Sequence, residues 1–380
     1  MIIIVSLALL VASAFITRQL VMNSHRFSQM DIPNERSSHF TPTPRGGGLS
    51  FVATSIVGFL LLTLNSTIDR ADLLALCCAG IIVAIAGHLD DRQKISGATI
   101  RLGFHALGAI ILIVGIGFPS QISLFDRTID TGIIGSILGV LYLVWLLNLF
   151  NFMDGTDGIA AIEAIFVCIA GAILNYHVLS DINFSAPSII LATSTFGFLL
   201  YNWSPAKIFM GDTGSLILGF LVSFFSIKYI TINSSYAYDS RLENDAPLIV
   251  MVILILPLFD TLRMFSVRLF SGQSPFIGDR NHFHHILLDR GLSHWNATIF
   301  LLIFNLLAIY LYSEFSNQFS NNINFLLYFS LFVLYCLLAY FLSRNISKVN
   351  GVNSQYTNIN KLKRLELAEE KKANLNNLNN

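Results

Sequence analysis

Carboxylates at short spacings are the residues of this sequence best suited to chemistry. Asp90 and Asp91 directly follow an apolar run, while Asp154 and Asp157, each followed by a glycine, lie between two apolar segments. Adjacent acids repel each other. Asp90 and Asp91 are therefore either solvated separately or held together by a hard cation such as Mg²⁺, which prefers carboxylate and phosphate oxygens. Because a charged carboxylate beside hydrocarbon costs several kcal/mol unless it is paired or hydrated, these acids are candidates for function.

Two amide side chains precede the second acidic pair. Residues 148–158 read Asn-Leu-Phe-Asn-Phe-Met-Asp-Gly-Thr-Asp-Gly and contain no Lys or Arg to neutralise the acids. Asn148 and Asn151 can hydrogen-bond a sugar or a phosphate, and the two glycines let the backbone turn tightly. The alternative is a polar turn in which Asp154 or Asp157 caps the following helix.

A further acid, Asp212, lies in the segment Gly-Asp-Thr-Gly-Ser at 211–215, directly before another apolar run. Glycines beside a helix N-terminus expose backbone N–H groups that suit phosphate. Asp212 would repel such a phosphate directly but could hold a metal ion that bridges to it. Helix capping by Asp212, Thr213 or Ser215 is the structural alternative.

Three histidines within four residues, His282, His284 and His285, follow Arg280. On a helix, His282 and His285 would share a face. A zinc site would need further ligands, but the segment has no cysteine nearby and no His-Glu-x-x-His pattern. Contacts to the phosphates and the ring of a nucleotide are therefore the better interpretation.

The elements that must position these residues are membrane helices. The 380 residues are 54% hydrophobic and 12% charged, against about 25% charged in soluble proteins. Apolar runs of about 20 residues, the length that crosses roughly 30 Å of hydrocarbon, recur along the chain. The four cysteines fall inside these runs and are interpreted as packing residues. The run after Met1 lacks a basic start and a small-residue cleavage site, so we expect it to be retained.

We therefore predict an all-α polytopic membrane protein. Its transmembrane helices, about eleven in number, are expected near residues 2–22, 47–64, 72–89, 100–118, 132–150, 158–178, 187–201, 212–231, 247–267, 298–313 and 324–343. Residues 1–343 would form one transmembrane catalytic domain with cytoplasmic active-site loops. Residues 344–380, rich in Asn, Lys and Glu, would form a polar and disordered cytoplasmic tail.

Basic residues are divided unequally between the two faces of this arrangement. About nineteen of the 23 Lys and Arg residues lie on the face of the odd-numbered loops and the C-terminal tail, which the positive-inside rule makes cytoplasmic. The acidic and histidine clusters all fall on that face. So does the segment 33–48, in which Arg36 and Arg45 accompany prolines and three glycines in a turn suited to phosphate. The convergence indicates one shared site.

In this order, the motifs resemble those of a known family, the polyprenyl-phosphate N-acetylhexosamine-1-phosphate transferases, over residues 25–295. The resemblance implies a UDP-N-acetyl amino sugar as donor, undecaprenyl phosphate as acceptor, Mg²⁺ with Mn²⁺ as an alternative ion, and release of UMP. It places the enzyme in the inner (plasma) membrane bilayer, at the start of lipid-linked cell-envelope polysaccharides such as the O-antigen of lipopolysaccharide. Nucleic acid is not an expected partner, and a homodimer is one candidate assembly.

The resemblance also implies roles for individual residues. Asp90 would accept a proton from the lipid phosphate. The catalytic residues would be Asp90, Asp91, Asp154 and Asp157, and the metal ligands Asp212 and Asp91. The substrate-binding residues would be Lys94, Asn148, Asn151, Arg280, His282, His284 and His285. For Lys94 the alternative is an ordinary residue of the positively charged cytoplasmic face.

The donor sugar and the class of activity each have an alternative. Residues 280–285 resemble the loop of enzymes that transfer GlcNAc-1-phosphate and differ from the His-His-His-Phe-Glu form of the peptidoglycan translocase. The loop at 33–48 also resembles members that use 6-deoxy amino sugars, so we expect UDP-GlcNAc, with UDP-FucNAc as the alternative. A transporter or flippase is the competing class. It would need polar residues near span centres and internal repeats, whereas these acids lie at one membrane edge.

Overall fold

The computed structural model describes residues 2–24, 29–32, 41–64, 69–92, 97–124, 127–179, 182–235, 246–272, 281–316 and 318–344. Within these ranges the chain forms thirteen helices and two pairs of short antiparallel strands. The predicted all-α class is confirmed. Residues 345–380 fall outside the described ranges, so the tail at 344–380 and the division into two domains stay predictions.

The larger of two helix groups is built around α8 and α9. Helix α8 packs against α1, α3 and α7, whereas α9 packs against α3, α4, α6 and α7. Long neighbouring helices bury the apolar faces of α9 on several sides, which makes it the central span. The group consists of α1 (Ile2–Met22), α3 (Gly48–Leu64), α4 (Arg70–Asp91), α5 (Ala98–Ile116), α6 (Gly132–Met153), α7 (Ile159–Leu179), α8 (Ile182–Asn202) and α9 (Asp212–Ser235).

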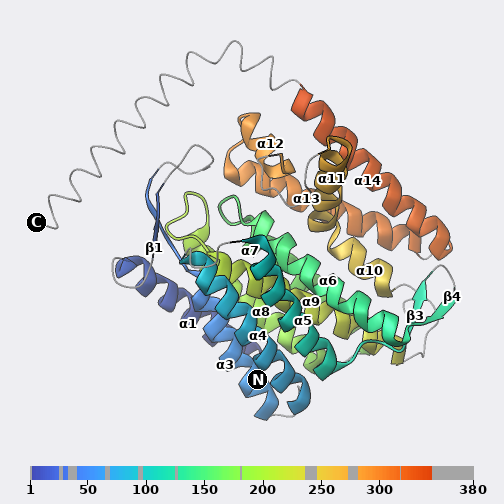
Figure 1. The fold of residues 1–380 in the computed structure, drawn as a ribbon, viewed down its shortest axis with the longest axis horizontal. Helices are drawn as coiled ribbons and strands as arrows, with labels where there is room; N and C mark the ends of the chain where they lie inside the picture. The colour runs from blue at the N-terminus through green and yellow to red at the C-terminus, as the bar shows by residue number, and fades with distance from the viewer. Residues whose placement is uncertain are drawn as a thin grey trace, which may run out of the picture.

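The remaining helices form a second group, which lies beside the first in Figure 1. Helix α13 contacts all four other members, while α11 reaches α6, and α10 reaches α7 and α9. The members are α10 (Ala246–Ile253), α11 (Ile255–Phe270), α12 (Phe283–Asp289), α13 (His294–Ser316) and α14 (Asn321–Arg344). Helices α10 and α11 meet at 79°. Pro257 in the first turn of α11 has no N–H for the carbonyl four residues earlier, which favours a break at this point.

Eight helices in the described ranges are long and apolar enough to cross a membrane, and the bent pair α10–α11 would make a ninth. The protein is therefore a multi-pass membrane protein, but the expected count of eleven spans is not confirmed. The difference arises mainly at α3, which has only 17 residues, at α8, and at the bend between α10 and α11. Each expected span nevertheless overlaps a helix.

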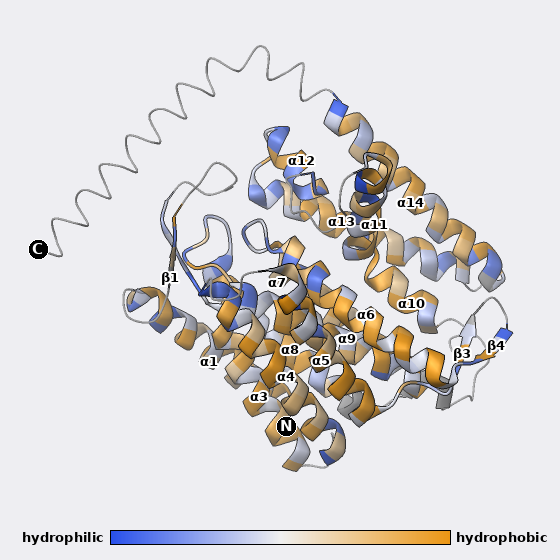
Figure 2. Cartoon of the chain, viewed as in Figure 1, coloured by the Kyte–Doolittle hydropathy of each residue, from blue (hydrophilic) through white to orange (hydrophobic). Residues whose placement is uncertain are grey.

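Polar groups separate into two ends of the helix bundle. Figure 2 shows hydrophobic colour along most helices and dense hydrophilic colour in the loops between β1 (Gln29–Asp31) and α12. At the opposite end lie the paired strands β3 (Gln121–Leu124) and β4 (Arg127–Asp130), together with a 2.5 Å ion pair between Lys228 and Asp72. The end near β1 holds most of the predicted site residues.

One polar contact lies deep between the helix groups. Glu163 of α7 and Asn305 of α13 are both buried, and Asn305 Nδ2 donates a 2.7 Å hydrogen bond to Glu163 Oε2. Burying such a pair is tolerated because the hydrogen bond replaces part of the lost hydration. This contact ties the second helix group to the first.

Candidate active site

An arginine from the first loop joins two of the predicted acids. Arg45 ends strand β2 (Thr43–Arg45), and its guanidinium lies 3.0 Å from Asp91 Oδ1 through Nε and 2.7 Å from Asp212 Oδ1 through Nη2. Burial lowers the pKa of Arg45, but the surrounding carboxylates, of which Asp212 and Asp91 contribute most, together raise it by more, so the pKa lies above its ordinary value. Arg45 is therefore a permanent cation between two acids.

Asp91, at the end of α4, caps the start of α9. Its carboxylate accepts hydrogen bonds from the backbone N–H of Asp212 at 2.8 Å and of Thr213 at 3.0 Å, and from Thr213 Oγ1 at 2.8 Å. The first N–H groups of a helix lack intrahelical acceptors, so a carboxylate from another helix can satisfy them. Asp91 of α4 therefore caps the N-terminus of α9, a capping partner beyond Asp212, Thr213 and Ser215.

Two glycines allow the start of α9 to lie this close to its neighbours. A Cβ on Gly87 of α4 would lie 2.5 Å from Thr213 Cα, and one on Gly48 of α3 would lie 2.4 Å from Gly214 Cα. Both clashes would be with backbone, which cannot rotate away. The close packing brings the carboxylates of α4 and α9 within reach of the same arginine.

Backbone hydrogen bonds fasten the Arg45 loop to the segment before α9. The N–H of Phe209 donates to Pro44 O at 2.8 Å, and the Phe209 carbonyl accepts from Gly46 at 3.1 Å and Gly47 at 2.9 Å. Gly211 has φ of 79°, a conformation that favours glycine. We call these backbone hydrogen bonds between residues 44–47 and Phe209 the strap. The strap holds Arg45 beside Asp212, which lies 167 positions later in the sequence.

Two predicted residues of the 148–158 run lie at this cluster. Asn151 Nδ2 donates to Asp212 Oδ1 at 2.9 Å and to Ser215 Oγ at 3.1 Å. Asp154 follows the last residue of α6, and burial raises its pKa well above the ordinary value; Arg45 opposes this, while the charges of Asp212 and Asp91 add to it. Burial and the neighbouring acids therefore both disfavour the charged form of Asp154.

Asp157 has a different environment from Asp154. Its Oδ2 accepts the backbone N–H of Ala206 at 3.1 Å and lies 3.8 Å from His294 Nδ1. The next N–H, of Gly158, donates to Asn202 Oδ1 at 3.1 Å. These contacts favour a role for Asp157 in fixing the loop between α6 and α7.

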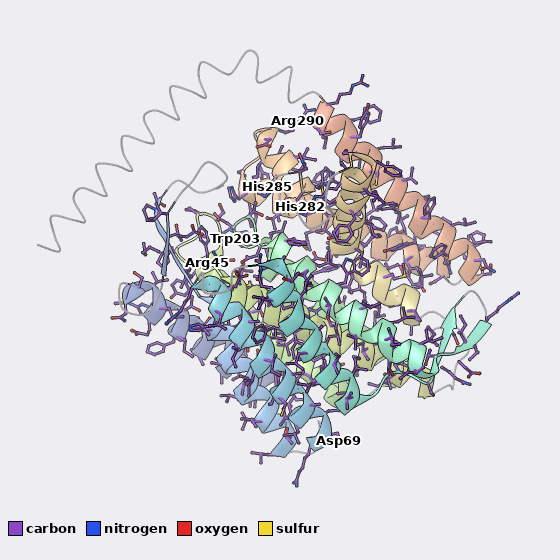
Figure 3. All side chains as sticks on the ribbon, viewed as in Figure 1. Arg45, Asp69, Trp203, His282, His285 and Arg290 are labelled. Carbon is purple, nitrogen blue, oxygen red and sulfur yellow. The ribbon has the colours of Figure 1, made fainter. Side chains whose placement is uncertain are left out.

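Two of the predicted histidines, His284 and His285 of α12, lie against that loop, and His282 directly precedes the helix. A Cβ on Gly155 would lie 3.2 Å from Nε2 of both His284 and His285. Burial and the neighbouring His285 hold the pKa of His284 well below its ordinary range, so its ring is neutral. Figure 3 shows Arg45, Trp203, His282 and His285 at one end of the molecule, far from Asp69.

A buried acid that sequence reasoning missed orients the first histidine. Asp260 of α11 accepts from His282 Nδ1 at 2.6 Å, from the N–H of Phe283 at 3.0 Å and from Tyr335 Oη at 3.1 Å, and pairs with Arg263 at 2.9 Å. A histidine bonded through Nδ1 keeps Nε2 for a ligand. The available signal was an ionisable pair three residues apart within a predicted span.

Two predicted residues bond outside the Asp91–Asp212 cluster. Asp90 Oδ2 pairs with Arg101 Nη1 of α5 at 2.9 Å. Asn148 Nδ2 donates to Val144 O at 2.6 Å and lies 3.3 Å from His105 Nδ1. Arg101 and His105 are further residues that sequence reasoning did not single out. Lys94 and Arg280 fall outside the described residues, so their roles stay predictions, as does that of Arg36.

The acids of the cluster suit a divalent cation whose coordination is completed by oxygens of the substrate. No group of three or more His, Cys, Asp or Glu side chains within the described ranges could enclose a metal ion. Mg²⁺ sites commonly use only one or two carboxylates together with substrate phosphates. Asp212 binds both Asn151 and Arg45 through Oδ1, and burial together with the neighbouring acids disfavours the charged form of Asp154, which a bound cation would stabilise. These two acids fit such an ion better than Asp91, whose oxygens accept several donors.

Known proteins are similar in sequence to this chain over most of its length. The sequence model described as glycosyl transferase family 4 matches residues 73–230, from α4 to α9. A decaprenyl-phosphate N-acetylglucosaminephosphotransferase of Mycobacterium leprae is 30% identical over 83% of this chain and 84% of its own. The chain belongs to glycosyl transferase family 4. Enzymes of family 4 generally depend on a divalent metal, in keeping with the acidic cluster.

Two further relatives of this family 4 enzyme have related names. A probable undecaprenyl-phosphate N-acetylglucosaminyl 1-phosphate transferase of Bacillus subtilis is 29% identical over 87% of each chain. An undecaprenyl-phosphate alpha-N-acetylglucosaminyl 1-phosphate transferase of Yersinia pestis is 28% identical over 77% of each chain. The matched shares, 77% to 87% of this chain, exceed the length of residues 73–230, so the similarity extends into the second helix group.

Proposed function

We propose that this family 4 enzyme transfers GlcNAc-1-phosphate from UDP-GlcNAc to undecaprenyl phosphate and releases UMP. The observation that carries the proposal is the cluster of Asp91, Arg45 and Asp212 at the end of a membrane bundle, where a soluble nucleotide and a lipid phosphate can meet. Relatives named for transfer of this sugar phosphate to polyprenyl phosphates support the same reaction.

The reaction sets a strict electrostatic requirement. An oxygen of the lipid phosphate attacks the sugar-bearing phosphorus of the donor, a new P–O bond forms, and the bond to the UMP oxygen breaks. Both reactants are anions, so the site must neutralise the transferring group. Arg45 is held by two acids and is permanently charged, so it can bind the donor diphosphate while its guanidinium stays protonated.

Mg²⁺ is the cofactor that we propose, with Mn²⁺ as the alternative. Asp212 and Asp154 would hold it beside the donor diphosphate, and Asn151 would keep Asp212 in position. When bound, the ion neutralises charge on the phosphate oxygens and on the departing UMP. Asp91 would act by orienting the start of α9, where its hydrogen bonds already lie.

The histidine side of the site would bind the nucleotide. Asp260 orients His282, while His284 and His285 lie over Gly155. A neutral His284 can donate to or accept from a uridine or ribose without adding charge. Arg280 is proposed to contact the donor diphosphate on the basis of the sequence alone.

The cellular setting follows from the charge distribution. With most basic residues on the active-site face, the positive-inside rule favours a cytoplasmic site in the inner membrane. There the protein would begin a cell-envelope polysaccharide such as O-antigen, from a cytoplasmic UDP-sugar. A homodimer is compatible with this setting.

Purified full-length protein in detergent tests the proposal. UMP release and the mass of the lipid product would be followed with UDP-GlcNAc, UDP-FucNAc and UDP-GalNAc as donors. We expect UMP release and a GlcNAc diphospholipid with the first donor. Turnover of UDP-FucNAc alone would show that FucNAc, and not GlcNAc, is the sugar transferred. No UMP with any donor, together with lipid movement in vesicles, would favour the flippase class instead.

A further inference from the structure

The partner of Asp90 points to a substrate contact that the proposed function leaves open. Asp90, the second-last residue of α4, binds Nη1 of Arg101, in the first turn of α5, at 2.9 Å. The Asp90 side chain is only 15% exposed, whereas that of Arg101 is 42% exposed. The guanidinium is thus held from one side and open on the other, where its remaining N–H groups can bind an anion.

Arg101 lies on α5 between an exposed apolar face of that helix and Asp90, the neighbour of the acidic cluster. Ile100, Leu107 and Val114 are exposed along one face of α5, as apolar side chains are where they meet acyl chains. The neighbour of Asp90, Asp91, bonds directly to the start of α9 and to Arg45. A lipid phosphate that moves along this face would reach Arg101 before it reached the cluster.

We propose that Arg101 binds the phosphate of the lipid acceptor and that Asp90 is the positioning residue that holds Arg101 for this contact. The inference rests on the proposed function. A guanidinium matches a phosphate monoester through two parallel hydrogen bonds. The first turn of α5, whose N-cap Gly97 provides no side-chain hydrogen bond, lies beside the guanidinium and has a helix N-terminus that favours anions.

This geometry gives Asp90 a task other than proton removal. Asp90 Oδ2 lies 2.9 Å from Arg101 Nη1, so this carboxylate oxygen is engaged by the guanidinium. The acceptor phosphate is already largely ionised near neutral pH, because the second pKa of a phosphate monoester is about 6. Asp90 therefore serves substrate placement, with the acceptor's own oxygen ready to attack.

Steady-state kinetics on the full-length protein separates the two substrates. The acceptor is varied at saturating UDP-GlcNAc, and then the reverse, for Arg101→Gln, Arg101→Lys and Asp90→Asn. Arg127→Gln, on strand β4 at the opposite end, is the matched control. We expect Arg101→Gln to raise the acceptor KM roughly 10- to 100-fold, the effect of losing a charge-assisted hydrogen bond, with the UDP-GlcNAc KM unchanged. Arg101→Lys should recover part of the loss, and Arg127→Gln should match wild type.

Asp90→Asn distinguishes a positioning residue from a base. A raised acceptor KM with a smaller change in kcat supports positioning. A collapse of kcat at an unchanged acceptor KM would overturn it. Thermal unfolding with UMP provides a check on folding, because every folded variant should keep the UMP-induced rise in Tm, whereas Arg101→Gln should lose the rise caused by undecaprenyl phosphate.

Two controls identify the source of the phosphate. If Arg101 binds only bulk anionic headgroups, its variant will differ from wild type in phosphatidylglycerol micelles and not in zwitterionic ones, and the proposal fails. A difference between variant and wild type that is equally large in both kinds of micelle supports the proposal. If wild type itself releases no UMP, the proposed function fails. The undecaprenyl phosphate shift in Tm then still decides whether Arg101 binds the lipid phosphate.

Discussion

A carboxylate can bind a cation only when its oxygens are not committed to other donors, and the acids of the site differ in this respect. Asp91 accepts three hydrogen bonds from Asp212 and Thr213 as well as the contact with Arg45. Asp212 uses Oδ1 for both of its side-chain contacts within the described part of the chain. Asp212 is therefore the better ligand, and Asp91 the better support.

Asp212→Asn isolates the charge of that ligand. The amide oxygen can still accept from Arg45 and Asn151, so folding should survive, while affinity for a divalent ion falls. We expect kcat to drop a few hundredfold, about 3 to 4 kcal/mol, the scale of losing a key electrostatic contact. UMP release in detergent measures it. Asp130→Asn, on strand β4 at the opposite end, is the control, and near-normal turnover by Asp212→Asn would rule out the metal role.

The raised pKa of Asp154 predicts a pH-dependent response to metal. Burial raises that pKa above the unfolded value, so the stability that its proton contributes is present below the unfolded pKa and lost as pH rises through the folded pKa. A divalent cation can replace the lost proton. The rise in Tm caused by Mg²⁺ should therefore grow with pH across that window. Scanning calorimetry checks it, and Asp154→Asn should remove the trend; a Tm rise equal at every pH would contradict it.

Among the elements, α9 depends most on its close contacts. Gly87→Ala would place a methyl group 2.5 Å from the Thr213 backbone, so α9 must shift and carry Asp212 with it. A displacement near 1 Å in a catalytic group can cost about 100-fold in rate, and we expect at least that loss in UMP release. The control is Gly171→Ala in α7, where a Cβ meets nothing within 4 Å. Equal activity of the two variants would show that α9 has room to move.

The contact between α7 and α13 should respond to polarity more than to charge. Glu163 Oε1 and Asn305 Oδ1 have no partner among the described residues, and a proton on Oε1 could bond the two. Asn305→Leu leaves Glu163 unpaired and should cost roughly 1 to 3 kcal/mol of unfolding free energy. Glu163→Gln should stay close to wild type in thermal unfolding. If Glu163→Gln destabilised as much as Asn305→Leu, an ionised Glu163 would be required instead.

Sequence patterns predicted the elements better than their contacts. Helices that cross hydrocarbon must be apolar, so apolar runs reveal them. The spans expected at 72–89 and 212–231 correspond to α4 and α9. Their direct contact was not predicted, because it depends on how α4 packs against α9. Asp260 was overlooked because it lies within an apolar segment. The bend at Leu254 had a local signal in Pro257, but a proline alone does not fix an angle.

At the scale of the whole molecule, the two polar ends predict a topology. Asn281 lies beside α12 at the active-site end, whereas Thr128 lies in β4 at the other. In a cysteine-free background, Asn281→Cys should react with a membrane-impermeant maleimide only from the cytoplasm, and Thr128→Cys only from outside. Intact spheroplasts and inverted vesicles give the comparison. The reverse labelling would overturn the cytoplasmic site while leaving the fold unchanged.

The strap between Arg45 and α9 also has a consequence for biosynthesis. The two ends of the ion pair with Asp212 are 167 residues apart, so at typical rates of translation roughly 8 to 33 s separate their emergence from the ribosome. Asp91 follows Arg45 by only 46 residues, so for most of that interval Asp91 is the partner that Arg45 can already reach. The newborn protein thus carries a half-formed cluster of Asp91 and Arg45 until α9 inserts, so insertion of this central span and completion of the cluster by Asp212 are a single event.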